Sequence, residues 1–271
     1  GRNIGVDRSV FFSSRIMNTC ALSGQAAGTL ATECLQSGKA PAELDEQEIE
    51  TIRRTLARDD MFLPGAAIDD PDDLAKQAAV SVSSVHNGHP GGMIGRISLK
   101  DGGSLAFPAV RSRRIQIEVH ADQTTTLRAR CALTKLPNRL NIGAETTERK
   151  WELRQGIQMI EAEITDEDQF CLWAFEANPL VSLAVCERVR VGFLCGQTGE
   201  PEVYEPRAWY PDAALYGAEQ LISGENRPWG GANAWIAAPE DPEPWAELRW
   251  DAPVAAHEMR LYLDPDLTME L

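Results

Sequence analysis

Short runs that alternate between apolar and polar residues fill the middle of the chain, from about residue 78 to residue 196. The clearest run is 114–120, Arg-Ile-Gln-Ile-Glu-Val-His, in which every second side chain is apolar. A period of two is typical of a strand that buries one face. Runs of apolar or alternating character also occupy residues 79–83, 104–110, 125–133, 159–164, 170–176, 180–187 and 190–194. Because these runs follow one another closely without helical patterns between them, they predict an antiparallel β-sandwich.

The amino-terminal part of the chain has a helical pattern instead. Residues 17–36 are mostly small and compatible with a helix, and Gly38 follows them as a residue that can end one. Gly24 and Gly28 lie four positions apart, so one face of this predicted helix carries almost no side-chain bulk. A glycine inside a helix costs about 0.5–1 kcal/mol relative to alanine. Two on one face therefore indicate the close approach of another backbone or of a flat ligand.

A second helix is predicted to begin at Asp45. Asp45 and Glu48 have the spacing of a capping box, and Ile49, Ile52 and Leu56 then recur at helical spacing on one face. The chain as a whole is therefore predicted to be mainly β, with a helical segment at its amino terminus.

The boundary between the two patterns is rich in residues that disfavour regular structure. Pro64-Gly65 is followed by the aspartate-rich stretch 69–73. We therefore expect four parts: a helical segment 1–65, a linker 66–75, a β-sandwich domain 76–200, and a partial second sandwich 204–271.

Several short motifs near the amino terminus resemble the last segment of the FAD-binding domain in bacterial FAD-dependent oxidoreductases. They are Gly1-Arg2, Ser13-Ser14-Arg15, Thr19-Cys20-Ala21 and Gly24-Gln25-Ala26-Ala27-Gly28. The resemblance implies that the predicted helix points its amino end at the flavin ring, where N–H groups and the helix dipole favour negative charge. The cofactor-binding residues that it implies are Gly1, Arg2, Arg15, Thr19, Gly24, Gln25 and Ala26.

The chain contains no G-x-G-x-x-G, the glycine pattern that binds the pyrophosphate of a dinucleotide. We therefore expect the chain to begin inside an FAD-binding domain. The earlier sequence of that domain is then the expected partner of this chain. An isolated chain of this kind is expected to bind FAD weakly or not at all and to be inactive by itself. The sequence assigns no catalytic residue.

Residues 204–271 resemble the first half of a discoidin-like, or galactose-binding-like, β-sandwich, with an alternating run at 258–263. Arg227, Trp229 and Trp235 form the candidate carbohydrate site in this part, because tryptophan rings can stack on sugars. The alternative for the tryptophans is that they anchor a sandwich core. The alternative function for the chain is accordingly a non-catalytic module that binds carbohydrate or another surface, and a glycoside hydrolase is the weakest reading because no carboxylate pair can be assigned.

The net charge of −15 makes nucleic acid a poor partner, because the surface would repel phosphates. No run of eighteen apolar residues and no signal-peptide pattern occurs, so we expect a soluble protein of undetermined location. The six cysteines lack C-x-x-C spacing and the four histidines show no ligand spacing, which predicts free thiols and no metal site.

Overall fold

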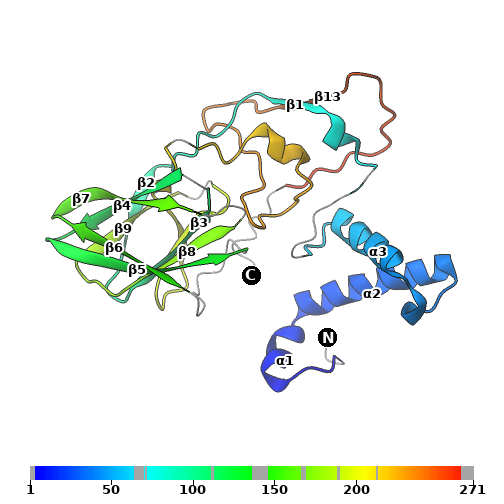
Figure 1. Ribbon diagram of the computed structural model, residues 1–271, viewed down its shortest axis with the longest axis horizontal. Coiled ribbons are helices and arrows are strands. Elements are labelled where there is room, and N and C mark those ends of the chain that lie inside the picture. Colours follow the sequence, from blue (N-terminus) through cyan, green and yellow to red (C-terminus); the bar gives the residue numbers. More distant parts are fainter. Residues whose placement is uncertain are drawn as a thin grey trace. The chain divides into compact units, whose positions relative to one another are not determined.

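The computed structural model describes residues 4–63, 70, 72–110, 113–135, 146–165, 169–187, 190–211 and 213–263. The chain divides into two compact units, Gly1–Asp73 and Leu74–Leu271 (Figure 1). The first unit is helical and the second is built mainly of strands.

The helical unit contains α1 (Arg8–Ser14), α2 (Met17–Ser37), a 3-10 turn at Pro41–Glu43, and α3 (Glu46–Arg58). α2 ends at Gly38, whose φ of 70° is left-handed, and the Lys39 N–H donates to the Cys34 carbonyl at 3.2 Å. This is the geometry in which glycine ends helices most readily, because it has no Cβ to clash. The predicted helix at 17–36 is therefore confirmed.

α3 begins with the predicted capping box. The Asp45 carboxylate accepts from the Glu48 N–H at 3.0 Å, and the Glu48 carboxylate accepts from the Asp45 N–H at 2.9 Å. Ile52 and Leu56 are buried with Met61 in a small core. Ala26 and Leu30 of α2 are partly buried against the same core, so α2 and α3 share one contact face.

The second unit contains thirteen strands in its described residues, and every strand pair is antiparallel. They are β1 (Ala79–Val82), β2 (Met93–Ser98), β3 (Gly103–Pro108), β4 (Arg113–Ala121), β5 (Thr125–Thr134), β6 (Thr147–Leu153), β7 (Gly156–Ile164), β8 (Phe170–Phe175), β9 (Val181–Cys186), β10 (Leu194–Gln197), β11 (Val203–Pro206), β12 (Ala208–Trp209) and β13 (Ala246–Arg249). Two 3-10 turns lie at Leu74–Gln77 and Ala218–Ile222.

Eleven of these strands form one curled sheet whose two halves face each other (Figure 1). One half pairs β2 with β9, β9 with β4, and β4 with β7. The other half runs β10-β3-β8-β5-β6, and β11 joins the halves by pairing with both β9 and β10. The expectation of an antiparallel β-sandwich behind a helical segment is thus confirmed.

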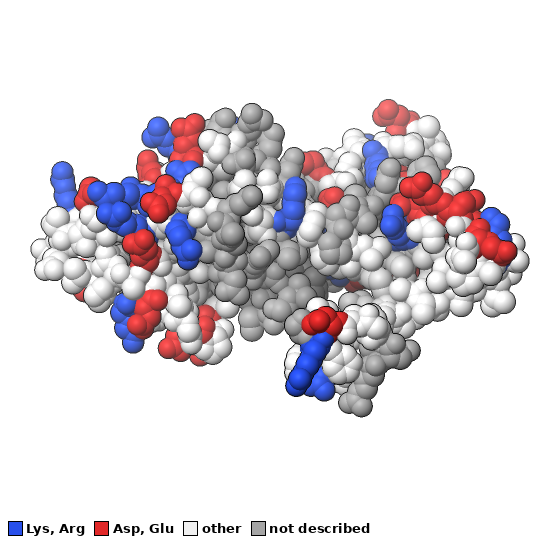
Figure 2. Space-filling view, turned by 60° about the horizontal axis from the view of Figure 1, so that its bottom comes forward, with Lys and Arg blue, Asp and Glu red and all other residues white. Residues whose placement is uncertain are grey.

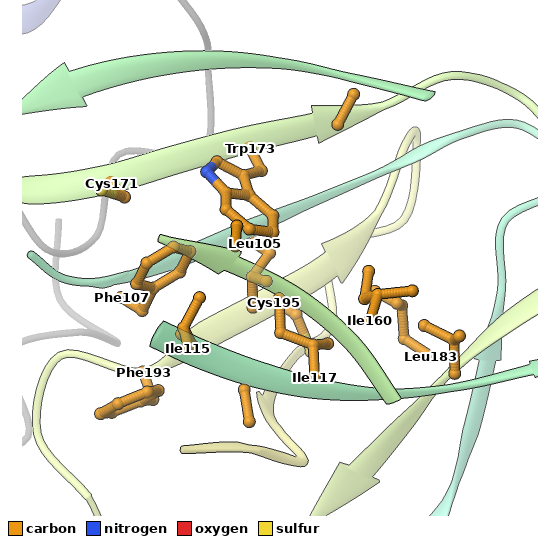
Figure 3. Packing of buried hydrophobic residues seen from close by; sticks show 14 of the residues in the cluster. Leu105, Phe107, Ile115, Ile117, Ile160, Cys171, Trp173, Leu183, Phe193 and Cys195 are labelled. Atoms are coloured by element: carbon orange, nitrogen blue, oxygen red, sulfur yellow. The ribbon is translucent and has the colours of Figure 1, made fainter. Parts of the chain in front are cut away.

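The core of the second unit fills the space between the two halves of the sheet. Figure 3 shows Leu105, Phe107 and Trp173 of one half pointing toward Ile117 and Leu183 of the other. The Phe107 and Trp173 rings meet edge to face with centroids 5.0 Å apart, a favoured aromatic geometry. The alternation that identified the strands in the sequence is therefore the alternation between this core and the outer faces.

β6 and β7 are consecutive along the chain but belong to different halves of the sheet. The Trp151 indole N–H donates to the Glu161 carbonyl at 2.9 Å, and Arg149 Nη2 donates to the Glu163 carbonyl at 3.0 Å. Side chains of β6 thus bond to the backbone of β7 and link the halves on this side.

The remaining chain after the curled sheet contains little regular structure. β13 pairs with β1 in a separate two-stranded sheet, so segments before and after the large sheet meet there. The alternating run 258–263 is in no strand of the described chain, and Met259, Leu261 and Leu263 are exposed. β11 and β12 belong to the large sheet, while the division into domains 76–200 and 204–271 stays a prediction.

Acidic and basic side chains lie next to one another on the described surface that Figure 2 shows. On the outer face of the large sheet, Glu118 accepts from Arg207 at 2.7 Å and from Arg96 at 3.4 Å. Acidic side chains on this face are therefore paired locally with arginines, while the net charge of the chain stays at −15.

Candidate functional site

The amino end of α2 is the first part of the candidate flavin-binding site. Ile16 is the N-cap residue, with extended backbone and no side-chain capping bond. The Cys20 N–H donates to the Ile16 carbonyl at 3.0 Å, so the positive end of the helix dipole lies at Met17–Thr19. An anionic group would be stabilised at this end of the helix.

Arg15 lies directly before this helix end and is exposed. Its guanidinium carbon is 5.4 Å from the Phe12 ring centroid and 5.8 Å from that of Phe11, within the range of cation–π contacts. Ser14 is buried, and its hydroxyl donates to the Phe11 carbonyl at 3.4 Å. Arg15 thus places a cationic residue between α1 and α2, next in sequence to the positive end of α2.

Three of the other predicted cofactor-binding residues lie beyond the first turn of the helix. Gly24, Gln25 and Ala26 lie in the interior of α2, where backbone N–H groups belong to the helix's own ladder. Gly24 and Gln25 are exposed, whereas Ala26 packs toward α3, because residues two apart lie on opposite sides of a helix. Gly1 and Arg2 lie outside the described residues.

The face that carries Gly24 and Gly28 is open. A Cβ added to either glycine would meet nothing within 4 Å in the described chain. The two glycines are therefore not required by any contact with the described residues, and their absent side chains leave room for a close neighbour.

Lack of charge distinguishes α2 further, and the sequence reasoning did not use this signal. None of residues 16–32 is Asp, Glu, Lys, Arg or His, yet no residue of α2 is buried. Met17 is 86% exposed, Leu35 is 84% exposed and Leu22 is 48% exposed. A helix on a protein surface normally has a charged side facing water, so this composition is typical of a helix that is covered on several sides.

The candidate carbohydrate residues use their polar groups within the fold. Arg227 is buried, and its Nη1 donates to the Asn226 carbonyl at 2.7 Å. The Trp235 indole N–H donates to the Ser84 carbonyl at 2.9 Å. Asn233, in a left-handed conformation with φ 49°, donates its side-chain amide to the carbonyls of Arg227 and Trp229 at 3.0 and 2.9 Å. These contacts favour the structural reading for Arg227 and Trp235.

A buried ion pair in the second unit was not expected from the sequence. Arg190 Nε lies 2.6 Å from Glu205 Oε1, and both side chains have no exposed surface. Arg190 also donates to the Gly88 carbonyl at 2.6 Å and stacks 4.1 Å from the Phe193 ring centroid. The Arg190 guanidinium is therefore paired inside the fold, and no pattern around Arg190 or Glu205 in the sequence reveals the pairing.

A cluster of metal ligands or a reactive thiol would be further signs of a chemical site. No group of three or more His, Cys, Asp or Glu side chains within the described ranges is placed to hold a metal ion. Burial raises the pKa of Cys131 to about 11, and burial also raises the pKa of Cys195, so both thiols stay protonated at neutral pH. No helix in the described part is long and apolar enough to cross a membrane.

Comparison with known proteins gives one match. Residues 1–56 match the family of FAD dependent oxidoreductases. No curated protein and no solved structure matches the chain. The matched residues span α1, α2 and most of α3, and the match supports the interpretation of this segment as the carboxy-terminal part of an FAD-dependent oxidoreductase.

Proposed function

We propose that this chain is the carboxy-terminal portion of an FAD-dependent oxidoreductase. In this proposal α1 and α2 complete an FAD-binding domain whose other elements come from sequence before Gly1, and the β unit is an accessory module. The observation that carries the proposal is the family match to residues 1–56, which includes the exposed stretch of α2 that has no charged side chain up to residue 32.

The amino end of α2 suits the flavin ring of FAD. Bound flavin would supply the redox chemistry, accepting a hydride from the substrate. The chain's own contribution is electrostatic, since Arg15 and the helix dipole at Met17–Thr19 favour negative charge beside them. Residues 1–271 lack the glycine pattern for the pyrophosphate, so these groups supply only part of the site.

The exposed face of α2 suits a position inside such a domain. Covering a leucine or methionine side chain is worth about 1.5–3 kcal/mol, so Met17 and Leu22 would contribute to docking. Gly24 and Gly28 would let a neighbouring backbone or the cofactor approach the helix closely. The absence of charge from residues 16–32 means that no ionised side chain would be desolvated.

The test is a Gly24→Leu substitution in the longer polypeptide that includes the upstream sequence. A leucine here would occupy the space left for the neighbour, so the flavin-to-protein ratio should fall and the reduction potential should become more negative. Thr51→Leu, at an exposed position of α3, is the matched control and should change neither. Flavin content and potential that both stay unchanged in Gly24→Leu would contradict the proposal.

A further inference from the structure

His86 is a buried histidine between β1 and β2, with 2% of its surface exposed. Its Nδ1 accepts a hydrogen bond from the Gly88 N–H at 3.0 Å. A backbone N–H can only donate, so Nδ1 carries a lone pair and the imidazole is neutral in this structure. The ring also meets Tyr216 edge-on, with centroids 5.8 Å apart.

A strap, defined as residues 232–241, is bonded to the chain around His86. The His86 N–H donates to the Ile236 carbonyl at 2.7 Å, and the Trp235 indole donates to the Ser84 carbonyl at 2.9 Å. The Ser83 and Ser84 hydroxyls each donate to Asp241 Oδ2 at 2.6 Å. Within the strap, Ala232 is buried in the main core, and Ala234 and Ile236 pack against it, so the strap covers one side of that core.

The charged surroundings oppose a proton on His86. Burial lowers the pKa of His86 most, and the charges of Arg190 and then His89 lower it further, while Glu205 and Glu240 act in the opposite direction. Arg190 reaches the same turn, because its Nη1 donates to the Gly88 carbonyl at 2.6 Å. Tyr216 faces the ring as a neutral phenol, since burial raises its pKa and its hydroxyl donates to the Val191 carbonyl.

We propose that His86 is a pH-sensitive switch. Proton uptake on its ring opens the turn at residues 86–89 and loosens the strap. A proton on Nδ1 places two donors face to face and breaks the bond with the Gly88 N–H. The new cation also lies near Arg190, whose own bond holds the other side of Gly88. The loss of order therefore begins in the turn and reaches the strap through the backbone bond to Ile236.

The direction of the pH dependence follows from the lowered pKa. In the opened turn His86 takes up a proton near its usual value of about 6.5, whereas in the closed turn it does so only at lower pH. The open state thus binds more protons, and the closed state loses stability as pH falls below about 6.5 and keeps it fully above. Hydrogen bonds from Ser83 and Ser84 lower the pKa of Asp241, so this carboxylate stays ionised over that range.

Hydrogen exchange of the whole chain at about pH 7.5 and about pH 5.5 tests the His86 switch. The rates are corrected for the pH dependence of intrinsic exchange. The expected result is that peptides covering 84–92 and 232–241 exchange about three- to tenfold faster at the lower pH, the factor that one lost hydrogen bond gives. Peptides from β4 and β8 should show no such change. Equal corrected rates at the two pH values in 84–92 and 232–241 would overturn the proposal.

Two variants distinguish the titration of His86 from the titration of other groups in the chain. His86→Asn places an amide oxygen where Nδ1 accepts from the Gly88 N–H but cannot titrate, so the acid-induced step should disappear. His89→Asn, at an exposed neighbouring position, should keep it. An acid step that persists in His86→Asn would overturn the proposal.

A measurement on the unmodified chain covers the case in which His86→Asn does not fold. An NMR titration of histidine-labelled protein should show one of the four histidines protonating at clearly lower pH than the others. If the His86 resonance instead titrates at or above the ordinary histidine value, the proposal is wrong.

Discussion

Gly24 lies inside α2 and Gly38 caps its carboxy-terminal end, and the two glycines have different backbone conformations. At both positions an added Cβ would meet no other part of the described chain within 4 Å, but Gly38 has a φ of 70° and Gly24 lies in ordinary helix. The space around both residues is therefore equally open, and only the backbone conformation distinguishes them.

In the chain 1–271, Gly24→Ala should stabilise the helical unit by roughly 0.5–1 kcal/mol, because alanine lowers the entropy cost of helix formation. Gly38→Ala is the matched control and should destabilise it by about 1 kcal/mol, because alanine disfavours positive φ. Thermal unfolding followed by circular dichroism at 222 nm measures both. A destabilising Gly24→Ala would show that the glycine already has a contact within this chain.

The Arg190–Glu205 pair provides a second test at the level of single residues. Glu205→Leu leaves the Arg190 guanidinium buried without its carboxylate, which should cost about 3–5 kcal/mol in urea unfolding. The double variant Arg190→Met/Glu205→Leu should recover most of that loss. Glu152→Gln, which breaks the exposed contact with Lys150, should leave the urea midpoint unchanged. A double variant as unstable as the single one would contradict this account.

The direction in which each residue of the candidate site faces was the hardest feature of the site to predict from the sequence. The resemblance implied that Gly24, Gln25 and Ala26 contact the cofactor. The helix turns by about 100° per residue, and of these three residues Ala26 lies toward α3. Arg15 and Thr19 lie at the amino end of α2. Whether these residues bind FAD stays a prediction.

At the level of elements, local signals predicted the fold well where they were complete. α3 followed from the Asp45 and Glu48 capping box, and β4 followed from its strict alternation. Both signals depend on neighbours in sequence, so a single chain reveals them.

The elements that were missed lack such signals. β2 contains Gly95 and an irregular register between Met93 and Gly95, which interrupts its alternation. β6 carries Arg149 on its inner side, where a charged residue obscures the apolar pattern. The strand predicted at 190–194 begins only at Leu194, because Gly192 has a left-handed φ of 88° and forms a turn.

The whole molecule consists of two compact units whose cores are made from separate parts of the chain. The helical core uses Ile52, Leu56 and Met61, whereas the main core of the second unit begins at Ile97. We therefore predict that limited proteolysis first cuts near residues 66–73, most of which lie outside the described residues.

The fragment from about residue 75 onward should then stay folded, with a β-rich circular dichroism spectrum and an unfolding temperature close to that of the intact chain. The physical reason is that its strands bury their apolar faces against each other. A fragment that unfolds once released would show instead that both units depend on one core.

The binding of FAD tests the central claim most directly. The chain 1–271 should bind FAD more weakly than about 1 μM in a fluorescence titration, because it supplies few contacts and submicromolar affinity requires more than about 8 kcal/mol. The longer polypeptide that includes the upstream sequence should be yellow after purification, with about one flavin per chain, because it completes the site. A colourless longer polypeptide, or submicromolar binding by residues 1–271 alone, would contradict the account.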